Sequence, residues 1–312
     1  MQQIELDLLY QDQLKNFELA ASNYHGLQQV LYRDIPLDGF NIRLQFNPAR
    51  IISTNAKIDA DTLKQRSCFL CPQNMPTAQR GISYNEHYNV FINPYPIFAP
   101  HFTIPSRSHE PQLLGTRMED MLNIAFDFPD YTIFYNGPSC GASAPDHFHF
   151  QLVPRHQMPL ETDIAQESIQ ATIVRKDFYH IYKLQNYLRE TIILQASDQK
   201  LLCRLFSQVQ KSIGQHVAFE EEPMFNLLCW FDNCQWTLCI FPRKTRRPWQ
   251  FFAEGAEKIM FSPGCVDMAG LIITPRREDF DKYSAELLAD LFHQVSIEQE
   301  VMLLIFQDLQ KL

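Results

Sequence analysis

The chain has 312 residues, 46% of them hydrophobic and 12% aromatic, so it is long enough and apolar enough to form one large folded domain or two ordinary ones. It carries 27 Lys and Arg against 36 Asp and Glu, a net charge of −9 that excludes a global field attracting nucleic acid or an anionic membrane. An anionic substrate must therefore bind in a local basic pocket.

The first seven residues lack a basic segment and a long apolar run, and no later segment offers about 18 uninterrupted apolar residues. We therefore expect a cytoplasmic protein, a monomer or a homodimer, with neither nucleic acid nor membrane as a partner. Eight cysteines without a secretion signal are better explained as thiols and metal ligands than as a disulfide framework.

The first half of the chain combines helical and strand-like patterns. Apolar residues at helical spacing predict a helix over residues 5–22, and residues 28–53 predict short strands separated by turns. Cys68 and Cys71 follow in a tight Cys-x-x-Cys knuckle. Further elements are predicted over 88–93, 101–105 and 131–136 as strands and over 111–124 as a helix. These patterns favour an antiparallel α+β arrangement.

A change in composition suggests a boundary after Arg155. Residues 158–168 are polar and connect two halves, which we place at 1–157 and 158–312. The second half is predicted to contain strands over 171–175, 225–231, 235–241 and 269–274 and helices over 198–215, 284–295 and 298–309. Its basic loop, residues 242–249, is either a solvated face or a set of phosphate contacts supplied to the first half.

The stretch that begins at His147 alternates strictly between polar and apolar side chains, which predicts a half-buried strand. Side chains two apart share a face, so His147, His149 and Gln151 lie opposite Phe148 and Phe150. A neutral imidazole is a good nucleophile near pH 7, and a phosphoryl-imidazole bond is labile enough to be broken by an acceptor. One such histidine is sufficient for group transfer.

This stretch resembles the histidine-triad superfamily, whose transferase branch, typified by galactose-1-phosphate uridylyltransferase, has Gln in place of the third His, as Gln151 does here. Asn136 lies 11 residues before His147, and the run from Gly141 to Pro145 is similar to the Gly/Ser-rich loop that precedes this motif in the uridylyltransferases. Segments 236–243 and 261–270 also resemble nucleotide-sugar and diadenosine tetraphosphate phosphorylases. The resemblance implies an α+β fold of tandem histidine-triad-like halves, each an antiparallel sheet with packed helices, the second half being degenerate.

The Cys-x-x-Cys knuckle is a candidate metal site because its turn brings two thiolates to one tetrahedral ion. Redox pairs and buried core thiols use the same spacing, and phosphorylase relatives can lack the metal. The knuckle resembles the zinc knuckle of the uridylyltransferases, which implies a structural zinc held by Cys68, Cys71, His109 and His147. His87 and His101 are the alternatives to His109.

The resemblance also implies the chemistry. His149 would attack the α-phosphorus of a nucleotide sugar or dinucleoside polyphosphate, and a sugar phosphate or inorganic phosphate would accept the nucleotidyl group. Gln151 would be the second catalytic residue, donating its amide N–H to a nonbridging oxygen. Asn136 and Ser143 would bind substrate, Ser143 together with backbone N–H groups of its loop. Arg155 would reach a terminal phosphate, or else be an exposed arginine at the strand end.

The sequence therefore favours a nucleotidyltransferase or phosphorylase that forms a covalent nucleotidyl-His149 intermediate. A nucleotide hydrolase is disfavoured because Gln151 replaces the third histidine. A non-catalytic, zinc-stabilised nucleotide-binding protein is disfavoured by the intact His149-x-Gln151 pair. Asp146 and Phe148 stand where the uridylyltransferases have proline, and Phe148 favours the phosphorylase branch.

Overall fold

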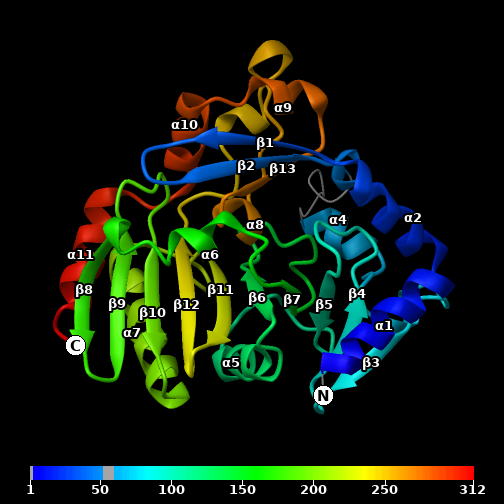
Figure 1. Cartoon of the computed structure of the whole chain (residues 1–312), viewed down its shortest axis with the longest axis horizontal. Helices are drawn as coiled ribbons and strands as arrows, with labels where there is room; N and C mark the ends of the chain where they lie inside the picture. The colour runs from blue at the N-terminus through cyan, green and yellow to red at the C-terminus, as the bar shows by residue number, and fades with distance from the viewer. Residues whose placement is uncertain (1–2, 52–59) are drawn as a thin grey trace.

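A ten-stranded sheet dominates the structure, a computed structural model that describes residues 3–51 and 60–312 (Figure 1). The strand order is β3-β4-β5-β7-β6-β11-β12-β10-β9-β8, and every neighbouring pair is antiparallel. The first five strands in this order come from the first half of the chain and the other five from the second half. The two halves meet where β6 pairs with β11.

The strands of the large sheet are β3 (Gly81–Tyr84), β4 (Tyr88–Ile92), β5 (Phe102–Pro105), β6 (Tyr131–Asn136), β7 (His149–Pro154), β8 (Gln170–Lys176), β9 (Tyr179–Leu184), β10 (Ile192–Ala196), β11 (Phe225–Asp232) and β12 (Gln235–Pro242). The helices are α1 (Gln3–Asn16), α2 (Glu18–Gly26), α4 (Ala60–Gln65), α5 (Met118–Asp127), α6 (Pro159–Asp163), α7 (Gln199–His216), α8 (Cys265–Met268), α9 (Arg277–Lys282), α10 (Ala285–Val295) and α11 (Gln299–Leu309). These elements confirm the predicted α+β class.

A second, three-stranded sheet links the two halves. β1 (Leu31–Pro36) pairs antiparallel with β2 (Asn41–Phe46), and β13 (Leu271–Thr274), from the second half of the chain, adds parallel to β2. This small sheet crosses above the large one in Figure 1. The division between residues 157 and 158 falls between β7 and α6, but both sheets continue across the two halves, so that division stays a prediction.

Each face of the large sheet has its own core, because side chains alternate along the strands. Ile133 and Tyr135 of β6 join a cluster with α5, α7 and α11, whereas Phe134 joins a cluster with α8, α10 and the small sheet. Phe148 and Phe150 lie in the first cluster, as their alternation predicts. The other face of β7 is therefore left for polar side chains.

Several predicted elements differ at their ends. The helix predicted over 5–22 is two helices that meet at Phe17, and the one predicted over 111–124 begins only at Met118. β7 begins at His149, so His147 precedes the strand. Strands β3, β9 and β10 were not predicted. Residues 52–53 of the predicted early strands lie outside the described residues. No helix in the described ranges combines the length and apolar character needed to cross a bilayer.

Candidate functional site

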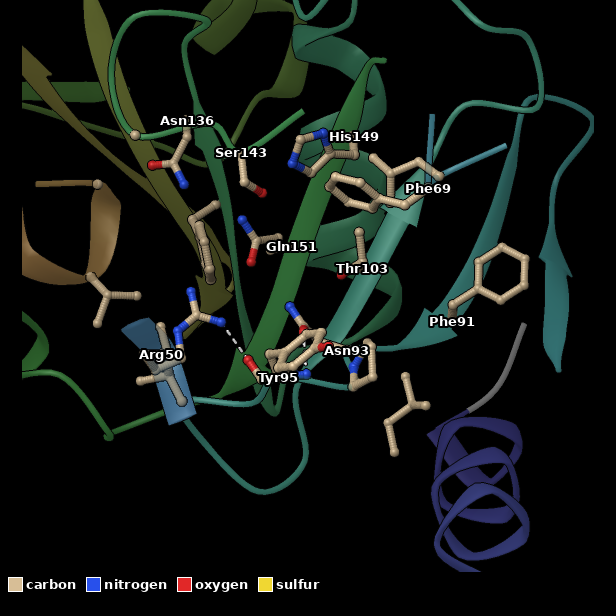
Figure 2. Close-up of a pocket in the computed structure, with 18 of the residues that line it drawn as sticks. Arg50, Phe69, Phe91, Asn93, Tyr95, Thr103, Asn136, Ser143, His149 and Gln151 are labelled. Atoms are coloured by element: carbon tan, nitrogen blue, oxygen red, sulfur yellow. Dashed lines mark hydrogen bonds between the residues drawn. The ribbon is translucent and has the colours of Figure 1, made fainter. Parts of the chain in front are cut away.

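A pocket of about 460 Å³ opens beside the junction of the two halves, on the polar side of β7 (Figure 2). Both halves line it: Asn136, Ser143, His149 and Gln151 come from the first, and Gly264 and Asp267 from the second. Four of the five residues predicted to catalyse or to bind substrate therefore face one cavity. Arg155 is the exception.

The pocket exists because β6 and β7 separate at one end. Their pairing stops at Phe134 and Gln151, and the buried side chain of Gln112 bridges the gap beyond. Its Nε2 donates to the carbonyl oxygens of Asn136 and His149, both at 3.0 Å, and its Oε1 accepts from the His149 N–H at 2.7 Å. Gln112 thus keeps the two strands apart with their backbone polar groups paired.

His149 is buried, and its ring has a defined tautomer. Nδ1 lies 2.9 Å from the His147 carbonyl oxygen, which can only accept, so Nδ1 carries the proton and Nε2 keeps its lone pair. Burial lowers the pKa of His149 to about 4, opposed by the hydrogen bond to His147. The ring is therefore neutral near pH 7, the form a nucleophile requires.

Gln151 is oriented by a buried histidine, His101. The Ile97 N–H donates to Nδ1 of His101 at 3.3 Å, so the ring proton is on Nε2, which lies 2.9 Å from Oε1 of Gln151. Burial lowers the pKa of His101 to about 3, which keeps this ring neutral. Because the Gln151 oxygen accepts from His101, its NH2 group faces the pocket as a donor. Figure 2 shows the amide between Ser143 and Thr103, below His149.

The small-residue loop before β7 approaches the second half very closely. Gly141 has φ +97°, and a Cβ there would lie 2.6 Å from the Cα of Gly264. Gly141 is therefore needed for the two backbones to meet at the pocket wall. Asn136 and Ser143 lie beside each other at the pocket, with Gln151 below them in Figure 2.

The rest of the wall divides into an aromatic part and a charged part. Phe69 lies beside His149 and is 48% exposed, and Phe91, a buried ring, lines the pocket further away, beyond Thr103 (Figure 2). On the other side, Arg50 donates to the Tyr95 carbonyl, and burial lowers the pKa of the Arg50 guanidinium to about 10, so it remains charged near pH 7. Sequence patterns gave no role to Phe91, Arg50 or Tyr95.

The four predicted metal ligands form one cluster, next to the pocket. The donor atoms of Cys68, Cys71, His109 and His147 all lie within 4.8 Å of one another. Cys71 Sγ is 3.3 Å from His109 Nδ1 and 3.4 Å from His147 Nδ1. The predicted alternatives His87 and His101 are not in the cluster, and His101 instead contacts Gln151.

This donor set suits a tetrahedral zinc ion, since two sulfurs and two imidazole nitrogens converge. His147 Nε2 lies 2.8 Å from the Ser106 carbonyl oxygen, so Nε2 carries the proton and Nδ1 has its lone pair directed at the thiols. Asp146, whose effect on His147 the sequence left open, forms an ion pair with Arg66, which lies 5.0 Å above the Phe69 ring. Arg66 therefore connects Asp146, the neighbour of the ligand His147, with the Phe69 ring of the pocket wall.

Arg155 does not line the pocket. Its Nε is 3.0 Å from Oε2 of Glu161, a side chain with no exposed surface, and its guanidinium lies 5.2 Å from the Trp230 ring. Four residues along a strand correspond to about 13 Å, which carries Arg155 past the end of β7. The predicted contact with a terminal phosphate is corrected: Arg155 pairs with a buried carboxylate.

We expect Arg155→Met to lower the free energy of unfolding by about 3 kcal/mol, because it leaves Glu161 buried without its cation. Nucleotide affinity should be unchanged. Urea unfolding and calorimetric titration measure the two effects. Arg80→Met is a matched control, since its pair with Asp12 is exposed and should contribute less than about 1 kcal/mol. A loss of affinity in Arg155→Met would restore a substrate role.

The basic loop 242–249 is neither a solvated face nor part of the pocket wall. Arg243 is fully buried, Lys244 pairs with Glu298 at 2.8 Å, and Arg247 donates to the Ser262 hydroxyl at 2.8 Å. These cations join the loop to neighbouring segments of the second half.

Comparison with known proteins supports the fold assignment. Residues 163–311 match the family model described as "GDPGP1-like, C-terminal domain", and residues 9–154 match "Domain of unknown function (DUF4922)". Yeast Ap4A phosphorylase Apa2 superposes with a TM-score of 0.63 at 16% identity, covering 93% of this chain and 97% of that one. The chain therefore has a fold similar to that of yeast Ap4A phosphorylase Apa2.

Two further structures are similar to this chain. The complex of Apa2 with Ap4A has a TM-score of 0.59 at 17% identity and covers 93% and 97% of the two chains. A uridylyltransferase structure has a TM-score of 0.40 at 12% identity and covers 90% and 99%. No curated protein sequence matches the chain. The structures of Apa2 confirm, at the level of the fold, the resemblance to diadenosine tetraphosphate phosphorylases inferred from the sequence.

Proposed function

We propose that the protein is a nucleotidyltransferase or phosphorylase that acts on a nucleotide sugar or a dinucleoside polyphosphate. The observation that carries this proposal is the His149 ring, whose unprotonated Nε2 lies in a pocket where Gln151 presents an N–H donor. Nucleotidyl transfer requires at least a nucleophile and, beside it, a hydrogen-bond donor to a phosphoryl oxygen. The yeast protein with the matching fold is an Ap4A phosphorylase.

In the first step, the lone pair of His149 Nε2 would form a bond to the α-phosphorus while the bond to the leaving phosphate oxygen breaks. The proton stays on Nδ1, which donates it to the His147 carbonyl oxygen, and this hydrogen bond stabilises the positive charge that develops on the ring. Gln151 Nε2 and the Ser143 hydroxyl would donate to the nonbridging oxygens. In the second step, an acceptor phosphate oxygen would attack the same phosphorus and release His149.

The two parts of the wall suggest how the substrate lies. Phe69, beside His149 and half exposed, provides a flat apolar surface of the kind that a nucleobase prefers. Arg50, with its charge retained, is suited to the leaving phosphate or to the acceptor phosphate. A structural zinc would be held by Cys68, Cys71, His109 and His147, where it would fix the start of β7.

The test is an assay of nucleotide sugars and dinucleoside polyphosphates, each with inorganic phosphate or a hexose 1-phosphate as acceptor. Turnover that depends on the acceptor is expected for at least one pair. Acceptor-independent release of nucleoside monophosphate would favour the hydrolase, and binding without turnover would favour the non-catalytic alternative.

We expect Gln151→His to raise the ratio of water attack to acceptor attack, because it restores the third histidine of the hydrolases. Product analysis by ion-exchange chromatography measures the ratio. Gln151→Glu is the matched control: it replaces the donor by an anion and should lower both reactions by about 100-fold. An unchanged ratio in Gln151→His would contradict a role for Gln151 in choosing the acceptor.

A further inference from the structure

Arg243 is a buried cation whose surroundings are unusual. It follows β12, is 1% exposed, and pairs all five of its N–H groups. Nε donates to Val295 O at 3.1 Å, Nη2 to Thr245 O at 3.1 Å and Arg246 O at 3.2 Å, and Nη1 to Pro263 O at 3.0 Å and Asn226 Oδ1 at 2.7 Å. All five acceptors are uncharged oxygens, four of them backbone carbonyls, so the one side chain it holds is Asn226.

The contact with Arg243 fixes the direction of the Asn226 amide. A guanidinium can only donate, so the Asn226 oxygen must face Arg243 and the NH2 group must face away. Nδ2 of Asn226 then donates to Asn136 Oδ1 at 2.8 Å and to the Cys140 carbonyl at 2.6 Å. Asn226 and Asn136 are direct partners across the β11–β6 pair, where the two halves meet.

The direction of the Asn136 side-chain amide follows from its hydrogen bonds in the same way. Its oxygen accepts from Asn226 and also from the Cys265 N–H at 2.7 Å, so these two donors fix the direction of the Asn136 oxygen and the NH2 group points the other way. The Asn136 NH2 group is therefore turned toward the cavity that Ser143 and His149 line (Figure 2). The two amide dipoles run head to tail from a buried positive charge, and their positive end reaches the pocket wall.

We propose that Arg243 and Asn226 are positioning residues that hold the Asn136 amide with its N–H groups toward a phosphoryl oxygen of the ligand. This inference rests on the proposed function and deepens it, because it gives the second half of the chain a part in anion binding. Asn226 and Arg243 act through Asn136 and touch no ligand. The pocket thereby presents amide donors from two sides, Asn136 on β6 and Gln151 on β7.

The decisive variant is Asn226→Asp, which keeps the shape of the side chain and the acceptor for Arg243. Its second oxygen faces Asn136 Oδ1, so the Asn136 amide must reverse or be repelled, and the pocket loses its donor. We expect the affinity for the tightest-binding of AMP, GMP, CMP and UMP to fall by about tenfold or more. Asn233→Asp, the same change at the exposed β11–β12 turn, is the matched control and should leave affinity unchanged.

A double-variant cycle separates positioning from general damage. If Asn226 acts through Asn136, then Asn226→Asp should change nucleotide affinity by less than about threefold once Asn136→Ala is present. An equally large loss in that background would overturn the proposal. Any effect on thermal stability should persist in both backgrounds.

The orientation can also be measured without a ligand. In protein with 15N-labelled asparagine, the Asn136 side-chain amide protons should exchange with water faster than those of Asn226, and Asn226→Asp should slow them. Equal protection of the two amides in the unsubstituted chain would overturn the inference. Failure of that chain to bind any of the four nucleotides would instead contradict the proposed function, and the exchange measurement would still decide the orientation.

Discussion

Replacing His149 by alanine should abolish both nucleotidyl transfer and labelling of the protein. Incubation with the correct donor, radiolabelled at the α-phosphate, and no acceptor should leave label on the unsubstituted chain. The label should be acid-labile and stable to alkali, as a phosphoramidate must be. His149→Ala should carry no label, and its turnover should fall by at least about 10⁴-fold, because no other side chain replaces the nucleophile.

The structure sharpens this expectation. The His149 ring has Nδ1 bound to the His147 carbonyl and Nε2 free for the phosphorus, so the label should reside on Nε2. His149→Gly should regain part of the activity with added imidazole, which can enter the space left by the ring. His25→Ala, at an exposed histidine, is the matched control and should behave like the unsubstituted chain. Substantial turnover in His149→Ala would refute the covalent mechanism and favour direct transfer between substrates.

The alternation of polar and apolar residues around β7 predicted correctly which side chains face the core and which face the pocket. A strand has a period of two, so the sequence alone separates Phe148 and Phe150 from His149 and Gln151. The same argument predicted too long a strand, because His147 lies in a turn where its N–H donates to the Ala144 carbonyl. The metal cluster needed the resemblance, since spacing alone leaves other partners open for Cys68 and Cys71.

Other parts of the site could not be predicted because their roles depend on contacts between distant segments. Gln112 lies in a segment whose apolar pattern predicts a helix, but α5 begins at Met118 and leaves Gln112 to bridge two strands. His101 is 50 residues from the Gln151 that it orients. Arg243 has a local charge pattern that indicates a solvated loop, although it is one of the most deeply buried polar side chains. No local sequence pattern identifies a partner that lies in a distant segment of the chain.

The second large effect that we expect concerns zinc. Metal-replete protein should contain about one zinc per chain, and Cys68→Ser combined with Cys71→Ser should contain none. The four donors belong to three segments: the knuckle, the loop after β5 that carries His109, and the turn before β7 that carries His147. An ion that binds only the folded arrangement stabilises it by about 4 kcal/mol when its concentration is a thousand times Kd. Elemental analysis and urea unfolding measure the two quantities.

Loss of zinc should also disturb the pocket, and it should weaken substrate binding more than it slows catalysis. Phe69 and Leu70 lie between the two thiols and line the cavity, so the knuckle fixes the wall that we assign to the nucleobase. Hydrogen exchange should increase over residues 68–71 and 147–151 in the double variant, and KM for the nucleotide substrate should rise more than kcat falls, because His149 keeps its own contacts on β7. Cys203→Ser with Cys234→Ser, two thiols outside the cluster, is the matched control and should retain zinc and affinity. If metal-replete protein contains no zinc, or if the double variant retains it, Cys68 and Cys71 are core thiols and the wall formed by Phe69 is held by the Arg66 contact instead.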